Sequence, residues 1–158
     1  MGWVALQDLT EGSENTVIGS AAGHEITTGN NNVLVGANAG STMTTQDEMV
    51  LIGYQAGAAV NSDNSDGTVA IGYQALAALT SPAGNTAIGY QAMLEHATGN
   101  NNTVIGYGAM NDSNGQAAEN NTFVGQGAGA GGYSGAAASN TAIGMMSFGV
   151  GAKTASAV

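Results

Sequence analysis

The sequence predicts an all-β protein, a parallel β-solenoid (β-roll) of about eight coils of roughly 17–19 residues each, and three observations predict it. A motif, Asn-Thr-Ala-Ile-Gly-Tyr-Gln-Ala-Met at positions 85–93, recurs with variations along most of the chain. Its copies follow one another at a short and nearly constant spacing, which is typical of solenoids. The chain contains 26 glycines and only 8% charged residues, which suits a thin, tightly coiled repeat. The glycines that mark the copies are Gly19, Gly36, Gly53, Gly72, Gly89, Gly106, Gly125 and Gly144.

Each copy carries a short apolar segment that ends at its glycine. The residue just before the glycine, the pre-glycine column, is always β-branched, and we expect it to form the core because such side chains suit a pleated strand. This column consists of Ile18, Val35, Ile52, Ile71, Ile88, Ile105, Val124 and Ile143. The residue before it, the mid-strand column, is also apolar and must point to the opposite face. That second column consists of Val17, Leu34, Leu51, Ala70, Ala87, Val104, Phe123 and Ala142.

A strand that is apolar on both faces needs cover on both faces. A coil this short can form only a flattened roll, which covers one face of its own strand. We therefore expect a homo-oligomer whose rolls pack around a shared axis. The alternative is that the second face is lined by alanine and stays partly exposed. With the pre-glycine column inside, Ile88→Asp would place an unpaired charge in the interior of the roll.

The glycine permits a backbone turn, and the residues after it are predicted to continue the repeat. Four consecutive copies have tyrosine directly after the glycine, and we expect these rings to stack as a ladder and to be candidate surface contacts. They are Tyr54, Tyr73, Tyr90 and Tyr107. Further along the coil a large apolar residue replaces glycine in four copies, which indicates a second short strand there. These residues are Leu76, Met93, Met110 and Phe148.

Asparagine is found four residues before the glycine in six copies. Aligned asparagine amides can hydrogen-bond from coil to coil, so we expect a structural role and no ligand. The residues are Asn15, Asn32, Asn85, Asn102, Asn121 and Asn140, with Met49 and Thr68 in the other two copies. The connectors between copies are polar and rich in turn residues, and we expect the two additional residues of the longer copies to lie there.

The two ends of the chain depart from the repeat. Residues 1–14 are predicted to be an N-terminal cap or docking segment, since the open end of a solenoid must be covered and this stretch carries Trp3, Val4, Leu6 and Leu9. The solenoid repeats are predicted at 15–148 and a C-terminal tail at 149–158. The beginning of the chain does not have the pattern of a signal peptide.

Composition excludes several classes of function. The formal charge is −10, with Lys153 as the only basic residue, so we expect no nucleic acid as a partner and no anionic membrane surface. No stretch is long and apolar enough for membrane insertion. There is no cysteine, and hence no disulfide or thiolate metal site.

Few residues suggest chemistry. There are two His/Glu pairs, His24 with Glu25 and Glu95 with His96. They belong to copies four coils apart, so they cannot share one site within a chain, and we expect them to be solvated loop residues. The oxygen-rich loop 61–67 could attract calcium, but its spacing does not fit a known calcium motif, so we expect a polar loop. We predict that the protein is not an enzyme and has no catalytic residue, no cofactor and no metal site.

The motif at 85–93, followed by Thr98 to Tyr107, resembles repeats of phage tail-fibre and related bacterial surface proteins. Its centre, Asn-Thr-x-Ile-Gly-x-x-Ala, is also similar to the head repeat of trimeric autotransporter adhesins. The resemblance covers roughly residues 15–148. It implies a trimer of parallel β-rolls with a role in attachment or fibre building. From these residues alone we expect no coiled-coil stalk, membrane anchor or C-terminal chaperone domain of the kind that members of these families carry.

The sequence thus favours a non-enzymatic structural and adhesive protein of a virion. It would be a homotrimeric phage fibre, fibre tip or head decoration on the tail or capsid exterior, with loops that contact a host glycan or surface receptor. The N-terminal segment would join it to other virion or surface proteins. One alternative is a fragment of a trimeric adhesin on a bacterial cell surface. Another is an ice- or glycan-surface-binding solenoid, although Val33, Val50 and Val69 interrupt the threonine array that ice binding would need.

Overall fold

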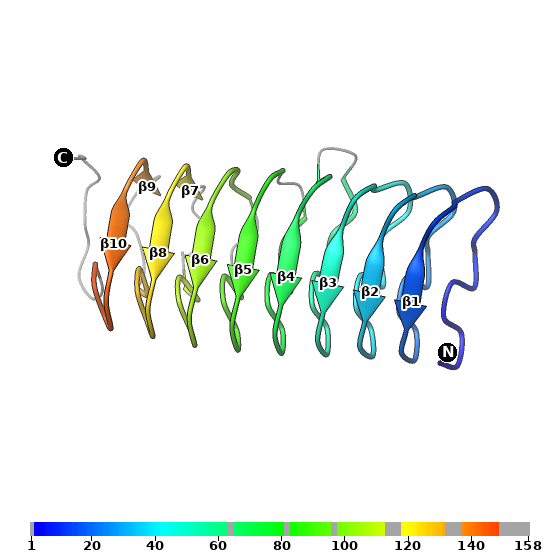
Figure 1. The fold of residues 1–158 in the computed structure, drawn as a ribbon, viewed down its shortest axis with the longest axis horizontal. Coiled ribbons are helices and arrows are strands. Elements are labelled where there is room, and N and C mark those ends of the chain that lie inside the picture. The colour runs from blue at the N-terminus through cyan, green and yellow to red at the C-terminus, as the bar shows by residue number, and fades with distance from the viewer. Residues whose placement is uncertain are drawn as a thin grey trace.

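The protein is an all-β parallel solenoid of about seven turns (Figure 1). The computed structural model describes residues 2–62, 65–80, 83–95, 98–112, 118–131 and 137–148. Eight three-residue strands form one parallel sheet in chain order, and β1 and β10 lie at its opposite ends. The strands are β1 (Thr16–Ile18), β2 (Val33–Val35), β3 (Val50–Ile52), β4 (Val69–Ile71), β5 (Thr86–Ile88), β6 (Thr103–Ile105), β8 (Thr122–Val124) and β10 (Thr141–Ile143). Two shorter strands, β7 (Ala118–Glu119) and β9 (Ala137–Ala138), pair in a second parallel sheet.

The strands stack in register in both the short and the long copies. Val33 pairs with Val50 across one of the shorter steps, and Val50 pairs with Val69 across one of the longer steps. The additional residues therefore lie in the connectors, as predicted. This register brings each column of the repeat into a continuous row along the rod.

The interior of the roll is lined by the mid-strand column, not by the pre-glycine column. Leu34, Leu51 and Phe123 have no exposed surface, whereas Ile18 is 50% and Ile143 is 73% exposed. The prediction that the pre-glycine column forms the interior is therefore wrong. The column that lies on the outer face instead consists of Ile18, Val35, Ile52, Ile71, Ile88, Ile105, Val124 and Ile143.

The rest of the interior comes from the leg of each coil that returns after the glycine turn. Alanine three residues past the glycine is buried in seven coils, from Ala22 to Ala128. Larger side chains fill the space beyond it, and they are Ile26, Met43, Val60 and Leu79. A small residue thus stands next to the turn and larger residues follow it, which lets the two legs of a flattened roll pack closely.

The predicted second strand at Leu76, Met93, Met110 and Phe148 is not formed. All four residues have a left-handed backbone, with φ of 53°, 53°, 48° and 58°. Glycine occupies the same place in other coils, as at Gly40 with φ of 56°. The position is therefore a turn. Leu76, Met93 and Met110 still direct their side chains into the core.

The asparagine ladder is confirmed. The Nδ2 of Asn102 donates to Oδ1 of Asn85 at 3.0 Å, and the Nδ2 of Asn121 donates to Oδ1 of Asn102 at 2.9 Å. The same bond joins Asn32 to Asn15 and Asn140 to Asn121. These side chains also bind backbone atoms of neighbouring coils, so a buried polar row connects the stacked turns.

The residues before β1 lie along the first coil. The backbone N–H of Leu6 donates to the Ala22 carbonyl at 3.2 Å, and that of Thr10 donates to the Thr27 carbonyl at 2.9 Å. Leu6 also packs against the core. Among the described residues the structure contains no helix with the length and apolar character that a membrane span requires.

Candidate functional site

The outer face of the main sheet carries no charge. Two columns point outward from it, the pre-glycine column and the first residue of each strand. The strand-first residues are Thr16, Val33, Val50, Val69, Thr86, Thr103, Thr122 and Thr141. Every residue of the two columns is Val, Ile or Thr, and all 11 acidic residues and Lys153 lie outside these eight strands. We call this surface the outer sheet face.

A row of stacked tyrosines follows the outer sheet face at the glycine turn. The ring centroids of Tyr54 and Tyr73 are 5.4 Å apart, those of Tyr73 and Tyr90 are 5.0 Å apart, and those of Tyr90 and Tyr107 are 4.9 Å apart. The predicted tyrosine ladder is thus confirmed, and its rings are 41–59% exposed. Their role as contacts with another molecule remains a prediction.

A second ladder runs beside the tyrosines. The Nε2 of Gln74 donates to Oε1 of Gln55 at 2.9 Å, and the Nε2 of Gln91 donates to Oε1 of Gln74 at 3.1 Å. Each inner tyrosine of the tyrosine ladder has a neighbouring ring against both of its faces. The tyrosine ladder therefore offers mainly ring edges and hydroxyl groups to its surroundings. It therefore suits contact with a flat partner surface better than sandwiching of a ligand.

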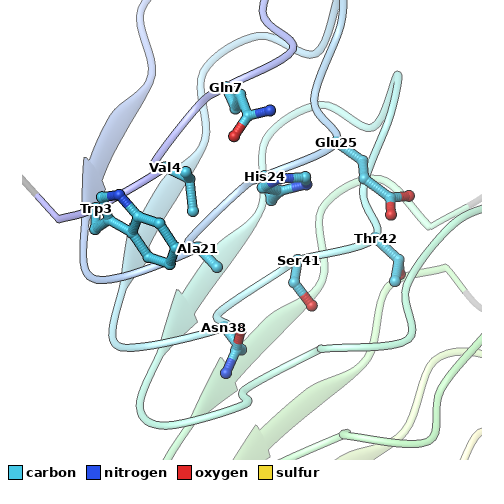
Figure 2. Close-up of a pocket in the computed structure, with 9 residues that line it drawn as sticks. All are labelled: Trp3, Val4, Gln7, Ala21, His24, Glu25, Asn38, Ser41 and Thr42. Atoms are coloured by element: carbon cyan, nitrogen blue, oxygen red, sulfur yellow. The ribbon is translucent and has the colours of Figure 1, made fainter.

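A groove of about 560 Å³ lies near the N-terminal end of the rod (Figure 2). Trp3, Val4 and Gln7 of the segment before β1 line it, and the next two coils contribute its other residues, among them His24, Asn38 and Thr42. The indole of Trp3 is 82% exposed. We call this surface the Trp3 groove.

Trp3 occupies the place of a tyrosine in the repeat. The Trp3 carbonyl accepts a hydrogen bond from Ala21 N–H at 2.9 Å, just as the Tyr54 carbonyl accepts one from Gln74 N–H at 2.8 Å. The following coils have Ser20 and Ala37 in this place, so the aromatic row is interrupted between Trp3 and Tyr54. As a result, no described aromatic ring stacks on Trp3.

The His/Glu pairs and the acidic loop are only partly described. His24 is half-buried in the Trp3 groove, and Glu25 is exposed at its edge. His96, and Asp63 and Asn64 of loop 61–67, lie outside the described residues. In the described part of the chain, no three His, Cys, Asp or Glu side chains come together in a way that could hold a metal ion.

The Trp3 groove was not predicted from the sequence. Its residues are scattered over three coils, and their types do not form a motif. One signal could have found it: Gly2 stands one repeat length before Gly19, which places Trp3 in the tyrosine column and the small Ser20 and Ala37 beside it. Comparisons of the chain with protein-family models, with curated proteins and with solved structures found no significant match.

Proposed function

We propose that this chain is a non-enzymatic structural and adhesive module of a phage particle, a fibre, fibre tip or head decoration, built as a homotrimer of parallel rolls of about eight coils each. The observation that carries the proposal is the outer sheet face, which is β-branched and uncharged over all eight strands. A surface of this kind marks an interaction site on a soluble protein.

The distribution of charge favours a second and third copy of the chain as the cover. A chain with a formal charge of −10 repels its own copies, and the repulsion is weakest where carboxylates are absent. Packing the outer sheet faces around a common axis keeps the acidic connectors outside. Complete burial of a fully exposed Val or Ile side chain is worth roughly 1.5–3 kcal/mol. Most of these side chains are already half-buried, so each contributes part of that value, and the contributions of many rungs together offset the cost of association.

The mechanism of such a module is geometric. Stacked strands at about 4.8 Å per coil make a stiff rod, and threefold symmetry presents each surface feature three times. Weak contacts with a host glycan or surface protein then add up to firm attachment. The segment before β1 would connect the rod to neighbouring virion proteins. The resemblance of the repeat motif to the head repeat of trimeric adhesins supports an alternative location for the same rod, the surface of a bacterial cell.

Ile88→Asp tests the assembly. Ile88 is half-buried on the outer sheet face, so the aspartate should leave the single roll folded but place three carboxylates at the common axis. Light scattering should give the parent three times the 15.4 kDa of one chain, and the variant a single-chain mass with an unchanged β-type circular dichroism spectrum.

Thr98→Asp is the matched control, because it adds the same charge at an exposed connector. It should keep the parental mass. A single-chain mass for the parent, or a trimer for Ile88→Asp, would refute the proposal. If the single chain also lowered the freezing point of water below the melting point of ice (thermal hysteresis), the ice-binding alternative would replace the proposal.

A further inference from the structure

We propose that the Trp3 groove is a saccharide-binding subsite that takes a neutral pyranose unit of a glycan. This inference deepens the attachment role and rests on it for its biological meaning, but binding in solution can be tested separately. It is carried by three features of the groove: a free aromatic face, a set of unengaged polar side chains, and the charge around them.

The indole of Trp3 is available for stacking. Its ring is 82% exposed and has no described ring against it, whereas each inner ring of the tyrosine ladder is covered on both faces by its neighbours. A pyranose has one face of outward-pointing C–H groups. These carry a small positive charge and are attracted to the negative face of an aromatic ring. Ser20 and Ala37, which stand at the tyrosine position in the next two coils, have no ring that could cover the indole.

Polar side chains complete the groove. Gln7, His24, Glu25 and Asn38 line it, and within the described residues none of their side-chain polar atoms has a hydrogen-bond partner. The Thr42 hydroxyl donates to the Ala58 carbonyl at 2.8 Å, which fixes its position and leaves its lone pairs to accept. Sugar hydroxyls both donate and accept, so they match this mixture of amide, imidazole, carboxylate and hydroxyl groups.

The charge of the molecule decides between classes of glycan. Glu25 stands at the edge of the groove, and the only basic residue of the chain is Lys153. A sialylated, sulfated or phosphorylated sugar would meet a chain with a net charge of −10, and none of the residues that line the groove is Lys or Arg. A neutral hexose or N-acetylhexosamine unit meets no such repulsion.

The groove stays open in the proposed assembly. Its residues Ala21, Asn38 and Ser41 belong to the turns and return legs after the glycine, while the outer sheet face is formed by the strands. Packing the strands around a common axis therefore leaves three grooves at the periphery. Three weak sites on one rod can bind a surface coated with glycan far more tightly than one.

Sugar binding can be followed by the intrinsic fluorescence of Trp3, because it is the only tryptophan of the chain. We expect its fluorescence to change saturably when the intact protein is titrated with a neutral methyl glucoside, methyl galactoside or N-acetylglucosamine, and to stay constant with glucose 6-phosphate. Asn38→Gly should weaken that binding roughly fivefold, the worth of about one hydrogen bond, and it keeps the reporter. Glycine suits this site because Asn38 has a φ of 56°.

Asn101→Gly is the matched control, since Asn101 has a φ of 57° and lies outside the groove, and it should bind like the parent. No response to any of the neutral sugars, a stronger response to glucose 6-phosphate, or equal affinity for both variants would overturn the inference. The mass of the same samples in solution, measured by light scattering, distinguishes failure of the trimer proposal from failure of the subsite proposal. A trimer without a sugar response refutes the subsite alone, and a single chain with a response refutes the assembly alone.

Discussion

Gly89→Ala is expected to destabilise the solenoid by on the order of 4 kcal/mol, the sum of backbone strain and overpacking. Gly89 has a φ of 141°, which side chains rarely adopt. A Cβ atom there would lie 2.6 Å from the Gly106 carbonyl carbon and closer still to its oxygen. Since that carbonyl belongs to the backbone of the next coil, relief requires the two coils to separate. Urea denaturation followed by circular dichroism measures the loss.

Gly67→Ala provides the comparison. Gly67 also has a positive φ, of 72°, but a Cβ added to it meets no atom within 4 Å. Only the strain of the left-handed backbone remains, which costs roughly 1–2 kcal/mol. Both variants should be measured at the same chain concentration, because stability depends on concentration if chains associate. Equal losses for the two variants would show that close approach of the coils does not explain the glycine column.

Asn102→Leu is expected to cost a similar amount, about 4 kcal/mol, because it leaves buried polar groups without partners. Asn102 is fully buried. Its Nδ2 donates to the Ala118 carbonyl at 2.7 Å, and its Oδ1 accepts the backbone N–H of Asn121 at 3.0 Å. Leucine has nearly the same size but satisfies neither group. The melting temperature and the urea midpoint should both fall.

Asn101→Gly is again the suitable control, since Asn101 is the neighbouring residue but is exposed. Among the described residues its side chain makes one hydrogen bond, a long one of 3.4 Å to Oδ1 of Asn120. This variant should differ from the parent by less than about 1 kcal/mol. If Asn102→Leu were as stable as Asn101→Gly, the asparagine ladder would not hold the coils together.

The period and the ladders could be predicted because they depend only on repetition. Once coils stack in register, equal residues at equal places must meet, so Tyr73 reaches Tyr90 and Asn85 reaches Asn102. These contacts need no knowledge of how the coil closes on itself. The all-β solenoid follows from the same regularity.

The direction of the strand faces was predicted wrongly because both columns are apolar. Hydrophobicity alone does not distinguish Leu51 from Ile52. The asparagine column contains the missing information: residues four and two places before the glycine share a face, since side chains alternate. A ladder of hydrogen-bonded amides is strongest in a dry interior, so Asn32 places Leu34 inside and Val35 outside.

The turn at Leu76 and the Trp3 groove escaped prediction for another reason. A buried leucine with a φ of 53° is stabilised by its surroundings and not by its own preference. The groove arises where the segment before β1 meets the next coils, and its chemistry depends on which neighbours are small. Both features follow from the closure of the coil, which the repeat pattern does not specify.

Single cysteines in β6 test most directly whether the outer sheet face is covered by further copies of the chain. The natural chain has no cysteine, so each introduced thiol reports alone. Ile105 is 36% exposed and the preceding Val104 is fully buried. Under mild oxidation we expect Ile105→Cys to form chain-to-chain disulfides, seen as a dimer band on a non-reducing gel, and Val104→Cys to stay unlinked. An Ile105→Cys protein that remains unlinked and reacts freely with maleimide would contradict the account.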